Sequence, residues 1–200
     1  MTGLDYTASP TVREASIPVL ETARLILRAP RLGDVKTIAV LANDRRVAEN
    51  TARVPHPYTI ADAEAWTAAA NAHAGMDNFV ITLTDDTLIG VCGLELRDDV
   101  APEIGYWLGV PYWGNGYATE AVRALIDHAF DNCEHDALRA GARVTNPASR
   151  HVLEKCGFQW TGVGLYRIRA INSSAPIDRF RLERSIWASL KSWGKTRRLA

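Results

Sequence analysis

The strongest chemical signal in the sequence is a glycine-rich turn at residues 111–119 (PYWGNGYAT), between a strand-like run and an amphipathic helical run. The first main-chain N–H groups of a helix have no acceptor within the helix, and the helix dipole adds roughly half a positive charge there. Glycines at 114 and 116, followed by the small Ala118, let a ligand approach these groups without meeting a Cβ atom. The pattern therefore predicts a main-chain anion cradle suited to a pyrophosphate.

Three kinds of phosphate-binding turn could carry such a pattern. A nucleoside-triphosphate P-loop needs Gly-x-x-x-x-Gly-Lys followed by Ser or Thr, and this turn has no such lysine. A Rossmann dinucleotide turn needs a third glycine where this chain has Thr119, and it belongs in an early β-α-β unit. We therefore favour the third kind, a pyrophosphate loop for coenzyme A.

Several segments resemble the GNAT acetyltransferase superfamily, and within it the ribosomal-protein N-terminal acetyltransferase-like group. Residues 21–28 (ETARLILR) are similar to that group's first strand, and residues 103–108 (EIGYWL) with 113–118 (WGNGYA) to its acetyl-CoA motif. Residues 146–158 (NPASRHVLEKCGF) are similar to its second cofactor motif. The superfamily usually has Gln or Arg where this chain has Trp113, which matters little to a site built from main-chain N–H groups.

The resemblance implies that acetyl-CoA is the cosubstrate. It also implies that the backbone of residues 108–110 pairs with the pantetheine arm, where an N–H group could stabilise the thioester oxyanion. The alternative is that these residues are simply a strand end and a turn. Asn146 is independently a candidate helix N-cap, and the resemblance adds a contact to the cofactor. The implied cofactor-binding residues are Leu108, Gly109, Val110, Trp113, Gly114, Asn115, Gly116, Tyr117, Ala118, Thr119 and Asn146.

Two residues are candidates for proton transfer. Glu103 lies on the same strand face as Trp107 by two-residue alternation, and a carboxylate can deprotonate an amine directly or through one water. The alternative is a solvent-facing glutamate on a half-exposed strand. For Ser149, the resemblance implies a role in protonating the leaving thiolate, and the alternative is an ordinary serine of the first helical turn.

These assignments predict an N-acetyltransferase that transfers acetyl directly from acetyl-CoA to an amine in a ternary complex. The acceptor could be a protein N-terminus or a small molecule such as a polyamine, an amino acid or an aminoglycoside-like drug. We expect the acceptor to be bound by two loops, residues 43–58 and 165–176, of a kind whose sequence varies freely between proteins. The alternative is a non-catalytic acyl-CoA-binding sensor or scaffold module, which would need neither Glu103 nor Ser149.

Composition limits the partners and the location. The 23 Lys and Arg residues balance the 23 Asp and Glu residues, and no nucleic-acid reader motif is present, so a nucleic-acid partner is not expected. Histidines and cysteines are scattered without metal-ligand spacing, which predicts no metal site. No run approaches the ~20 apolar residues of a membrane span, and residues 1–18 lack a signal-peptide pattern. We expect a cytoplasmic protein, and base rates favour a homodimer.

The periodicity predicts one mixed α/β domain, with a largely antiparallel central sheet flanked by helices. The resemblance implies that this sheet is splayed, because the strand before the cofactor loop separates from its neighbour to hold the pantetheine arm. A lead-in covers residues 1–18, the acetyltransferase domain 19–184, and a partly helical tail 185–200. We expect a short helix opening at Gly33-Asp34, and a second helix starting at a Thr59–Asp62 capping box. Further helices are expected from about residue 118 to 130 and from Asn146 to Gly157. The expected strands are residues 20–29, 78–83, 87–96, 102–108, 137–144, 158–163 and 178–182. Asp85-Asp86 and Asp98-Asp99 separate the second, third and fourth of these and predict the turns of an antiparallel meander.

Overall fold

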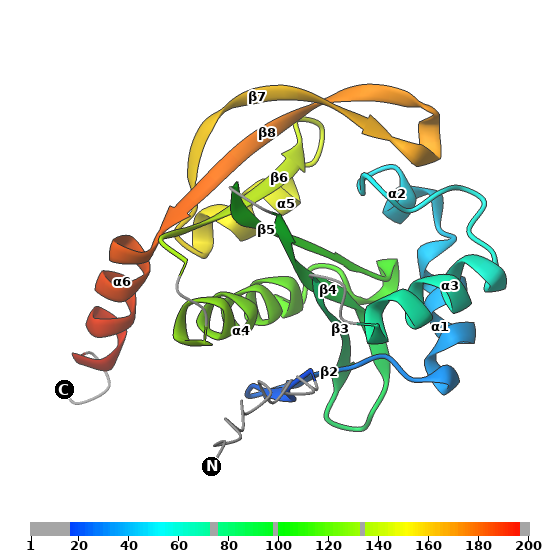
Figure 1. The fold of residues 1–200 in the computed structure, drawn as a ribbon, viewed down its shortest axis with the longest axis horizontal. Coiled ribbons are helices and arrows are strands. Elements are labelled where there is room, and N and C mark those ends of the chain that lie inside the picture. The colour runs from blue at the N-terminus through cyan, green and yellow to red at the C-terminus, as the bar shows by residue number, and fades with distance from the viewer. Residues whose placement is uncertain (1–16, 73–75, 98–99, 133–134, 197–200) are drawn as a thin grey trace, which may run out of the picture.

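The computed structural model describes residues 17–72, 76–97, 100–132 and 135–196 (Figure 1). The expected lead-in at 1–18 lies mostly outside the described residues, as do the expected turn at Asp98-Asp99 and the last four residues of the tail.

One eight-stranded sheet runs through the protein in the order β1-β2-β3-β4-β5-β6-β8-β7. Every neighbouring pair is antiparallel except β5 and β6, which are parallel. The mixed, largely antiparallel sheet predicted from the sequence is therefore confirmed. The strands are β1 (Leu20–Glu21), β2 (Leu25–Arg28), β3 (Met76–Leu83), β4 (Leu88–Arg97), β5 (Val100–Leu108), β6 (Ala137–Arg143), β7 (Gln159–Ile168) and β8 (Ser173–Glu183).

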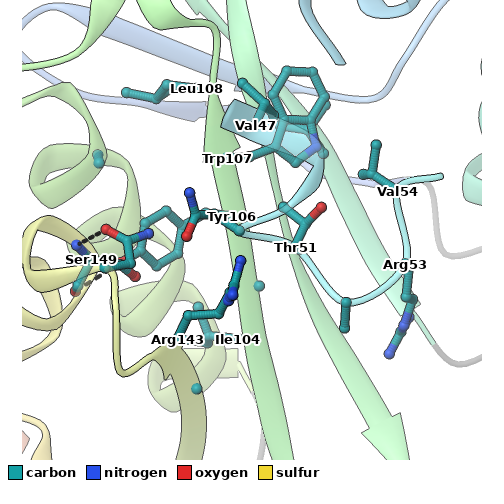
Figure 2. Close-up of a pocket in the computed structure, with 18 of the residues that line it drawn as sticks. Val47, Thr51, Arg53, Val54, Ile104, Tyr106, Trp107, Leu108, Arg143 and Ser149 are labelled. Atoms are coloured by element: carbon teal, nitrogen blue, oxygen red, sulfur yellow. Dashed lines mark hydrogen bonds between the residues drawn. The ribbon is translucent and has the colours of Figure 1, made fainter. Parts of the chain in front are cut away.

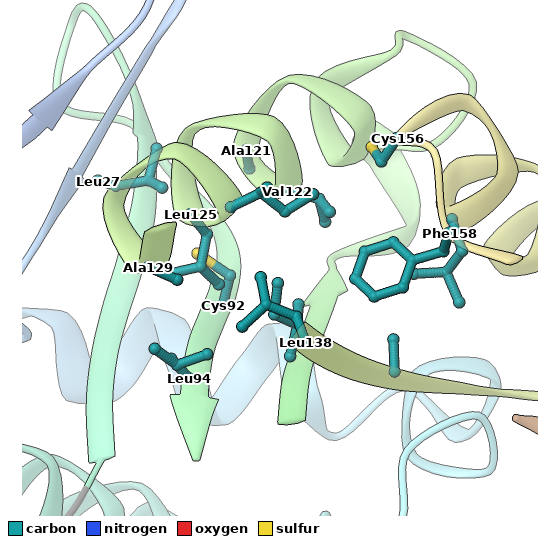
Figure 3. Close-up of a cluster of buried hydrophobic side chains, with 14 of the residues drawn as sticks. Leu27, Cys92, Leu94, Ala121, Val122, Leu125, Ala129, Leu138, Cys156 and Phe158 are labelled. Atoms are coloured by element: carbon teal, nitrogen blue, oxygen red, sulfur yellow. The ribbon is translucent and has the colours of Figure 1, made fainter. Parts of the chain in front are cut away.

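Helices cover both faces of this sheet, and the alternation along the strands explains how. In β3, Phe79 and Ile81 pack toward α4 on one face, whereas Val80 packs toward α1 and α3 on the other. Figure 3 shows the core under α4, where Val122, Leu125 and Ala129 meet the sheet. The helices are α1 (Val35–Ala42), α2 (Arg45–Ala48), α3 (Ile60–Asn71), α4 (Tyr117–Asn132), α5 (Pro147–Lys155) and α6 (Arg184–Thr196). No helix of the described residues is both long and apolar enough to cross a membrane.

The sheet opens between its two parallel strands. β5 and β6 pair only at Glu103 with Arg139 and at Ile104 with Ala140, while β6 pairs along its whole length with β8. Residues 105–108 of β5 therefore have no partner on β6, and the two strands diverge toward the glycine-rich turn (Figure 1). This divergence is the splay that the sequence resemblance predicted.

Local signals correctly located two helix starts beside this opening. The Thr59 hydroxyl accepts from the Asp62 N–H and the Asp62 carboxylate accepts from the Thr59 N–H, which is a capping box at the start of α3. The Asn146 side chain accepts from the Ser149 N–H at 3.1 Å and caps α5. The predictions for these two caps are confirmed.

Three predictions about the chain's path were wrong. The strand expected at 20–29 is interrupted at residues 22–24, where the Thr22 hydroxyl bonds the backbone of Leu25. The loop expected at 43–58 contains α2, which begins at the Asp44 N-cap. The loop expected at 165–176 is the far end of a long β7–β8 hairpin, which turns through a 3₁₀ turn at Arg169–Ile171. In these segments, pairing between strands and tertiary packing outweigh the turn-forming residues of the local sequence. A short stretch of sequence does not reveal such long-range contacts.

Candidate active site

The glycine-rich turn forms the expected cradle at the start of α4. Gly114 and Gly116 both have φ of 78°, a left-handed backbone that other residues adopt only with strain. A Cβ atom at Gly114 would meet no other atom within 4 Å, so space is open in front of the turn. Within the part of the chain that the structure describes, the N–H groups of residues 114–119 donate to no protein acceptor. These free donors at a helix start are what a pyrophosphate requires.

Side chains within the turn hold it in place. The indole Nε1 of Trp113 donates to the carbonyl oxygen of Leu108 at 2.7 Å. The Asn115 side-chain amide donates to the carbonyl oxygens of Tyr112 at 3.3 Å and Trp113 at 3.1 Å. Trp113 therefore ties the cradle to the end of β5, which is a structural role for the residue at which this chain departs from the superfamily pattern.

A carboxylate beside the cradle is neutralised by the turn between β1 and β2. Glu120 accepts from the Thr22 hydroxyl at 2.7 Å, from the Arg24 N–H at 2.9 Å and from the Arg24 guanidinium at 2.7 Å. Burial alone would raise the pKa of Glu120, but the hydrogen bonds from Thr22 and Arg24 lower it overall. The Arg24 guanidinium also lies 4.7 Å from the centre of the Tyr117 ring. The first turn of α4 therefore does not present an uncompensated negative charge to an anion.

The backbone at the end of β5 is partly engaged inside the protein. The Gly109 N–H donates to the Ile89 carbonyl oxygen at 2.9 Å, and the Leu108 carbonyl oxygen already accepts from Trp113. The Leu108 oxygen keeps a second lone pair, whereas the Gly109 N–H has no further hydrogen to donate. The expected pantetheine contacts of residues 108–110 stay a prediction. They fall more readily on Leu108 and Val110 than on the N–H of Gly109.

A cavity of about 950 Å³ joins the cradle to the opposite half of the molecule. Its lining includes Gly116 and Ser149 on the cradle side, and Thr51 and Trp66 on the side of α2 and α3. Figure 2 shows side chains from the α2 segment, β5, β6 and α5 converging on it. Gly105 lies in its lining between Glu103 and Trp107 on one strand face, and a Cβ atom there would meet nothing within 4 Å. The cavity is thus open to β5 at the point where the sheet splays.

Glu103 faces this cavity, and so does a second carboxylate that the sequence reading did not single out. Glu95 on β4 lies directly opposite Glu103 on β5, and both line the cavity. Glu95 forms an ion pair with Arg53, whereas the Glu103 carboxylate is 3.8 Å from the Arg139 guanidinium, with 26 % of its side chain exposed. No spacing rule in the sequence could have joined Glu95 to Glu103, because the hairpin register decides it.

Ser149 contacts a tyrosine, Tyr106, that the sequence did not identify as a candidate functional residue. The Tyr106 hydroxyl lies 2.9 Å from Ser149 Oγ and donates to the Ser149 carbonyl oxygen at 3.2 Å (Figure 2). Burial raises the pKa of the Tyr106 phenol above its ordinary value, so the hydroxyl stays protonated at neutral pH. Ser149 is therefore oriented by Asn146 through its N–H and by Tyr106 through its hydroxyl.

Among the described residues, no three His, Cys, Asp or Glu side chains are grouped closely enough to hold a metal ion. The chemistry available in the cavity is that of main-chain donors, three carboxylates, one serine–tyrosine pair and several cationic side chains.

Comparison with known proteins identifies the family. The acetyltransferase (GNAT) domain matches residues 24–159, which is more than half of the chain. The protein belongs to the GNAT acetyltransferase family. The match covers residues 24–28 of the first-strand segment and both motifs on which the sequence resemblance was based.

Individual relatives agree with this assignment. The chain is 36 % identical over 86 residues to the uncharacterized N-acetyltransferase p20 of Bacillus licheniformis, and 33 % identical over 86 residues to the ribosomal-protein-serine acetyltransferase of Escherichia coli. Each alignment covers 42 % of this chain, and the chain spans about half the length of these relatives, 48 % in both cases. The spermidine N-acetyltransferase of Vibrio cholerae, solved with CoA and spermine, shares the fold with a TM-score of 0.71 at 22 % identity, covering 84 % of this chain and 99 % of that one.

Proposed function

We propose that the protein is an N-acetyltransferase that transfers the acetyl group of acetyl-CoA directly to a primary amine in a ternary complex. The observation that carries this proposal is the continuous cavity, which runs from free main-chain donors at one helix start, past the splayed strands, to a carboxylate on β5. A site that only bound acyl-CoA would need the first two features and not the third.

The cradle would bind the pyrophosphate of acetyl-CoA. The free N–H groups of residues 114–119 supply the donors, and the α4 dipole favours the negative charge. The pantetheine arm would pass between the ends of β5 and β6 to the centre of the cavity. There it would meet Leu108, Val110 and Asn146. When bound, acetyl-CoA supplies the activated acyl group.

Glu103 is the proposed base. An α-amino group titrates near ~7.7–8.0 and a lysine near ~10.4, so either is largely protonated at neutral pH and cannot attack. A carboxylate in the cavity can take that proton directly or through one water. The nearby Arg139 offsets part of the charge of Glu103 without forming a close ion pair, at 3.8 Å.

Ser149 is the proposed partner of the leaving sulfur. A thiol titrates near ~8.5, so a thiolate needs little help to leave at neutral pH, and a hydrogen bond suffices. Because Tyr106 donates to the Ser149 carbonyl oxygen, the tyrosine oxygen can accept from Ser149 until the sulfur takes that hydrogen bond. Tyr106 thereby positions Ser149.

The acceptor is a protein N-terminus or a small-molecule amine. The named relatives include an enzyme for a ribosomal protein and a fold neighbour for spermidine, so the family supports both classes. A cytoplasmic location and a homodimer stay predictions.

The decisive experiment compares Glu103→Gln with Glu95→Gln in an assay of thiol release from acetyl-CoA with a panel of amines. Loss of a general base costs about 100-fold or more in kcat, so Glu103→Gln should lose that much at pH 7. The loss should shrink above the pKa of the acceptor amine, because the amine then deprotonates in water. CoA affinity, measured by calorimetry, should stay close to that of the wild type.

Glu95→Gln is the matched control, since it removes one negative charge from the same face of the same cavity. A larger kcat loss in Glu95→Gln than in Glu103→Gln would reassign the base to Glu95. If the wild type binds acetyl-CoA tightly and no amine stimulates thiol release, the non-catalytic binding module is the correct alternative.

A further inference from the structure

The cavity contains an arginine, Arg143, that forms no ion pair within the described part of the chain. Arg143 is the last residue of β6, four residues beyond Arg139, so its side chain lies on the same strand face as Arg139. Because Arg139 is level with Glu103 and the strands run parallel, Arg143 stands level with Trp107 across the splay. Figure 2 shows it extending from β6 into the space between Ser149 and Thr51, and all three residues line the cavity.

The donors of Arg143 are only partly used. Its Nη1 donates to the Glu49 carbonyl oxygen at 2.8 Å, and its Nε is buried without a hydrogen-bond partner. Among the described residues, no carboxylate forms an ion pair with it. The Glu49 carboxylate is within electrostatic reach, but its close partner is Arg45, which lowers the pKa of Glu49 most. A partly buried guanidinium normally has a carboxylate partner, because desolvating an uncompensated charge is costly.

Other arginines of the cavity do have such partners. Arg46 forms an ion pair with Asp44 at 2.7 Å, and Arg53 forms one with Glu95. Arg169, at the turn of the β7–β8 hairpin, resembles Arg143 instead: its Nη1 donates to the Arg53 carbonyl oxygen at 3.4 Å, and no ion pair to it is found in the described part of the chain. Arg143 and Arg169 thus hold two carbonyls of the segment that follows α2, and both line the cavity.

The arginines that line the cavity therefore differ in how far carboxylates of the protein neutralise them. Two of the four arginines that line the cavity, Arg46 and Arg53, have carboxylate partners, whereas Arg143 and Arg169 form no ion pair among the described residues. A polyamine would bring several positive charges toward Arg143 and toward Arg169, which has only the Asp62 carboxylate within electrostatic reach. An amine that carries its own carboxylate would instead supply the missing partner, with charge-assisted hydrogen bonds.

We propose that Arg143, together with Arg169, binds a carboxylate of the acceptor, so that the preferred substrate is an amine bearing a carboxylate close to the reacting nitrogen. This inference rests on the proposed acetyl transfer and narrows its substrate class. Arg143 is a specificity-determining residue, since it contacts the acceptor away from the reacting atoms. The carboxylate could belong to a free amino acid or to an acidic residue near a peptide N-terminus, and the two sources share this chemistry.

The test uses the full chain, saturating acetyl-CoA, thiol release and matched acceptors. L-Methionine is compared with L-methioninamide, the peptide Ser-Glu-Ala-Ala-amide with Ser-Gln-Ala-Ala-amide, and spermidine is the polycationic probe. The wild type should prefer the carboxylate member of at least one pair by about tenfold or more in kcat/KM, as expected for a hydrogen-bonded charge pair, and should use spermidine least. The first pair reports the amino-acid source and the second the peptide source.

Arg143→Gln should reduce that preference to nearly one, mainly by raising KM for the carboxylate acceptor. Arg143→Lys should keep part of it, because the charge remains while the planar donor pair is lost. Arg46→Gln is the matched control, since it removes a cavity arginine whose charge Asp44 already compensates, and it should leave the preference unchanged. The melting temperature of each variant is also measured, because Arg143 donates to the Glu49 carbonyl oxygen. A purely structural role would lower the melting temperature without changing the preference between acceptors.

Two results would overturn the inference while leaving acetyl transfer intact: equal use of carboxylate and amide acceptors by the wild type, or an unchanged preference in Arg143→Gln. If Arg143→Gln does not fold, the wild-type comparison and Arg143→Lys still decide the matter. Absence of thiol release with every probe would contradict the proposed transfer itself, and the inference with it.

Discussion

One half of the cavity is lined mainly by main-chain groups and the other half by side chains. The cradle side uses main-chain N–H groups of residues 114–119, and its side chains, such as Trp113 and Asn115, only hold the backbone in place. The acceptor side uses side chains, among them Glu103, Glu95 and Arg143, which come from three different strands. A backbone site depends on conformation and tolerates many residue types. A side-chain site changes its ligand whenever one residue changes.

This difference explains why the family could be identified and the acceptor could not. A conformation-dependent cradle leaves glycines at fixed spacing in the sequence. The acceptor side leaves single charged residues far apart, and their meaning depends on which strands are neighbours. The predictions below test this contrast, starting with the largest effect.

Gly116→Val should nearly abolish cofactor binding. A β-branched residue at a φ of 78° is strained, and relief of that strain moves the free N–H groups away from one another. We expect the Kd for CoA to rise by about 100-fold or more, which is about 2.7 kcal/mol, in isothermal calorimetry.

Gly33→Ala is the control for that variant. A Cβ atom at Gly33 meets nothing within 4 Å, as at Gly114, but Gly33 has no positive φ. CoA affinity should be unchanged in Gly33→Ala. Wild-type affinity in Gly116→Val would mean that the cradle does not bind the cofactor through a fixed backbone conformation.

Gly105→Leu should block the middle of the cavity and leave the cradle intact. The wild-type position is open toward the cavity, so a leucine side chain would fill the space beside Glu103 and Trp107. We expect kcat/KM for amines to fall by about 30-fold or more, with CoA affinity changed far less than in Gly116→Val. Gly105→Ala, which adds one methyl group, should have a small effect. Equal losses in the two variants would argue against steric blocking.

The clamp between Arg24 and Glu120 should contribute a small, pH-dependent stability. The pKa of Glu120 is lowered in the folded protein, so its contribution is present above the unfolded-state pKa, near ~4.3, and is lost as the pH falls through the lower folded pKa. Because half of the Arg24 side chain is exposed, solvent screening limits the coupling to about 0.5–1 kcal/mol.

A double-mutant cycle of Arg24→Gln and Glu120→Gln measures this coupling by urea unfolding at pH 7 and at pH 3. The coupling energy should be smaller at the lower pH, and each single variant serves as the control for the other. A coupling energy that stays constant between the two pH values would show that the contact is not electrostatic.

Features that depend on neighbouring residues in the chain were predictable. The buried stripe of α4, the Asn146 cap and the Thr59–Asp62 capping box follow from spacing, because a helix brings residues three and four apart together. The antiparallel order of β3, β4 and β5 also followed from three strand-like runs that Asp pairs separate in the sequence. Short helices such as α2 were missed, because one helical turn carries almost no periodic signal.

The glycine-rich turn and most of the helices and strands could be inferred from the sequence alone, since they arise from local backbone preferences of consecutive residues. The three-dimensional structure was needed to find that Glu95 lies opposite Glu103, that Tyr106 contacts Ser149, and that Arg143 extends into the cavity without an ion-pair partner among the described residues. Each of these pairings depends on strand register or on packing across the splay. Such contacts join residues from 8 to more than 40 positions apart, and no local rule encodes them.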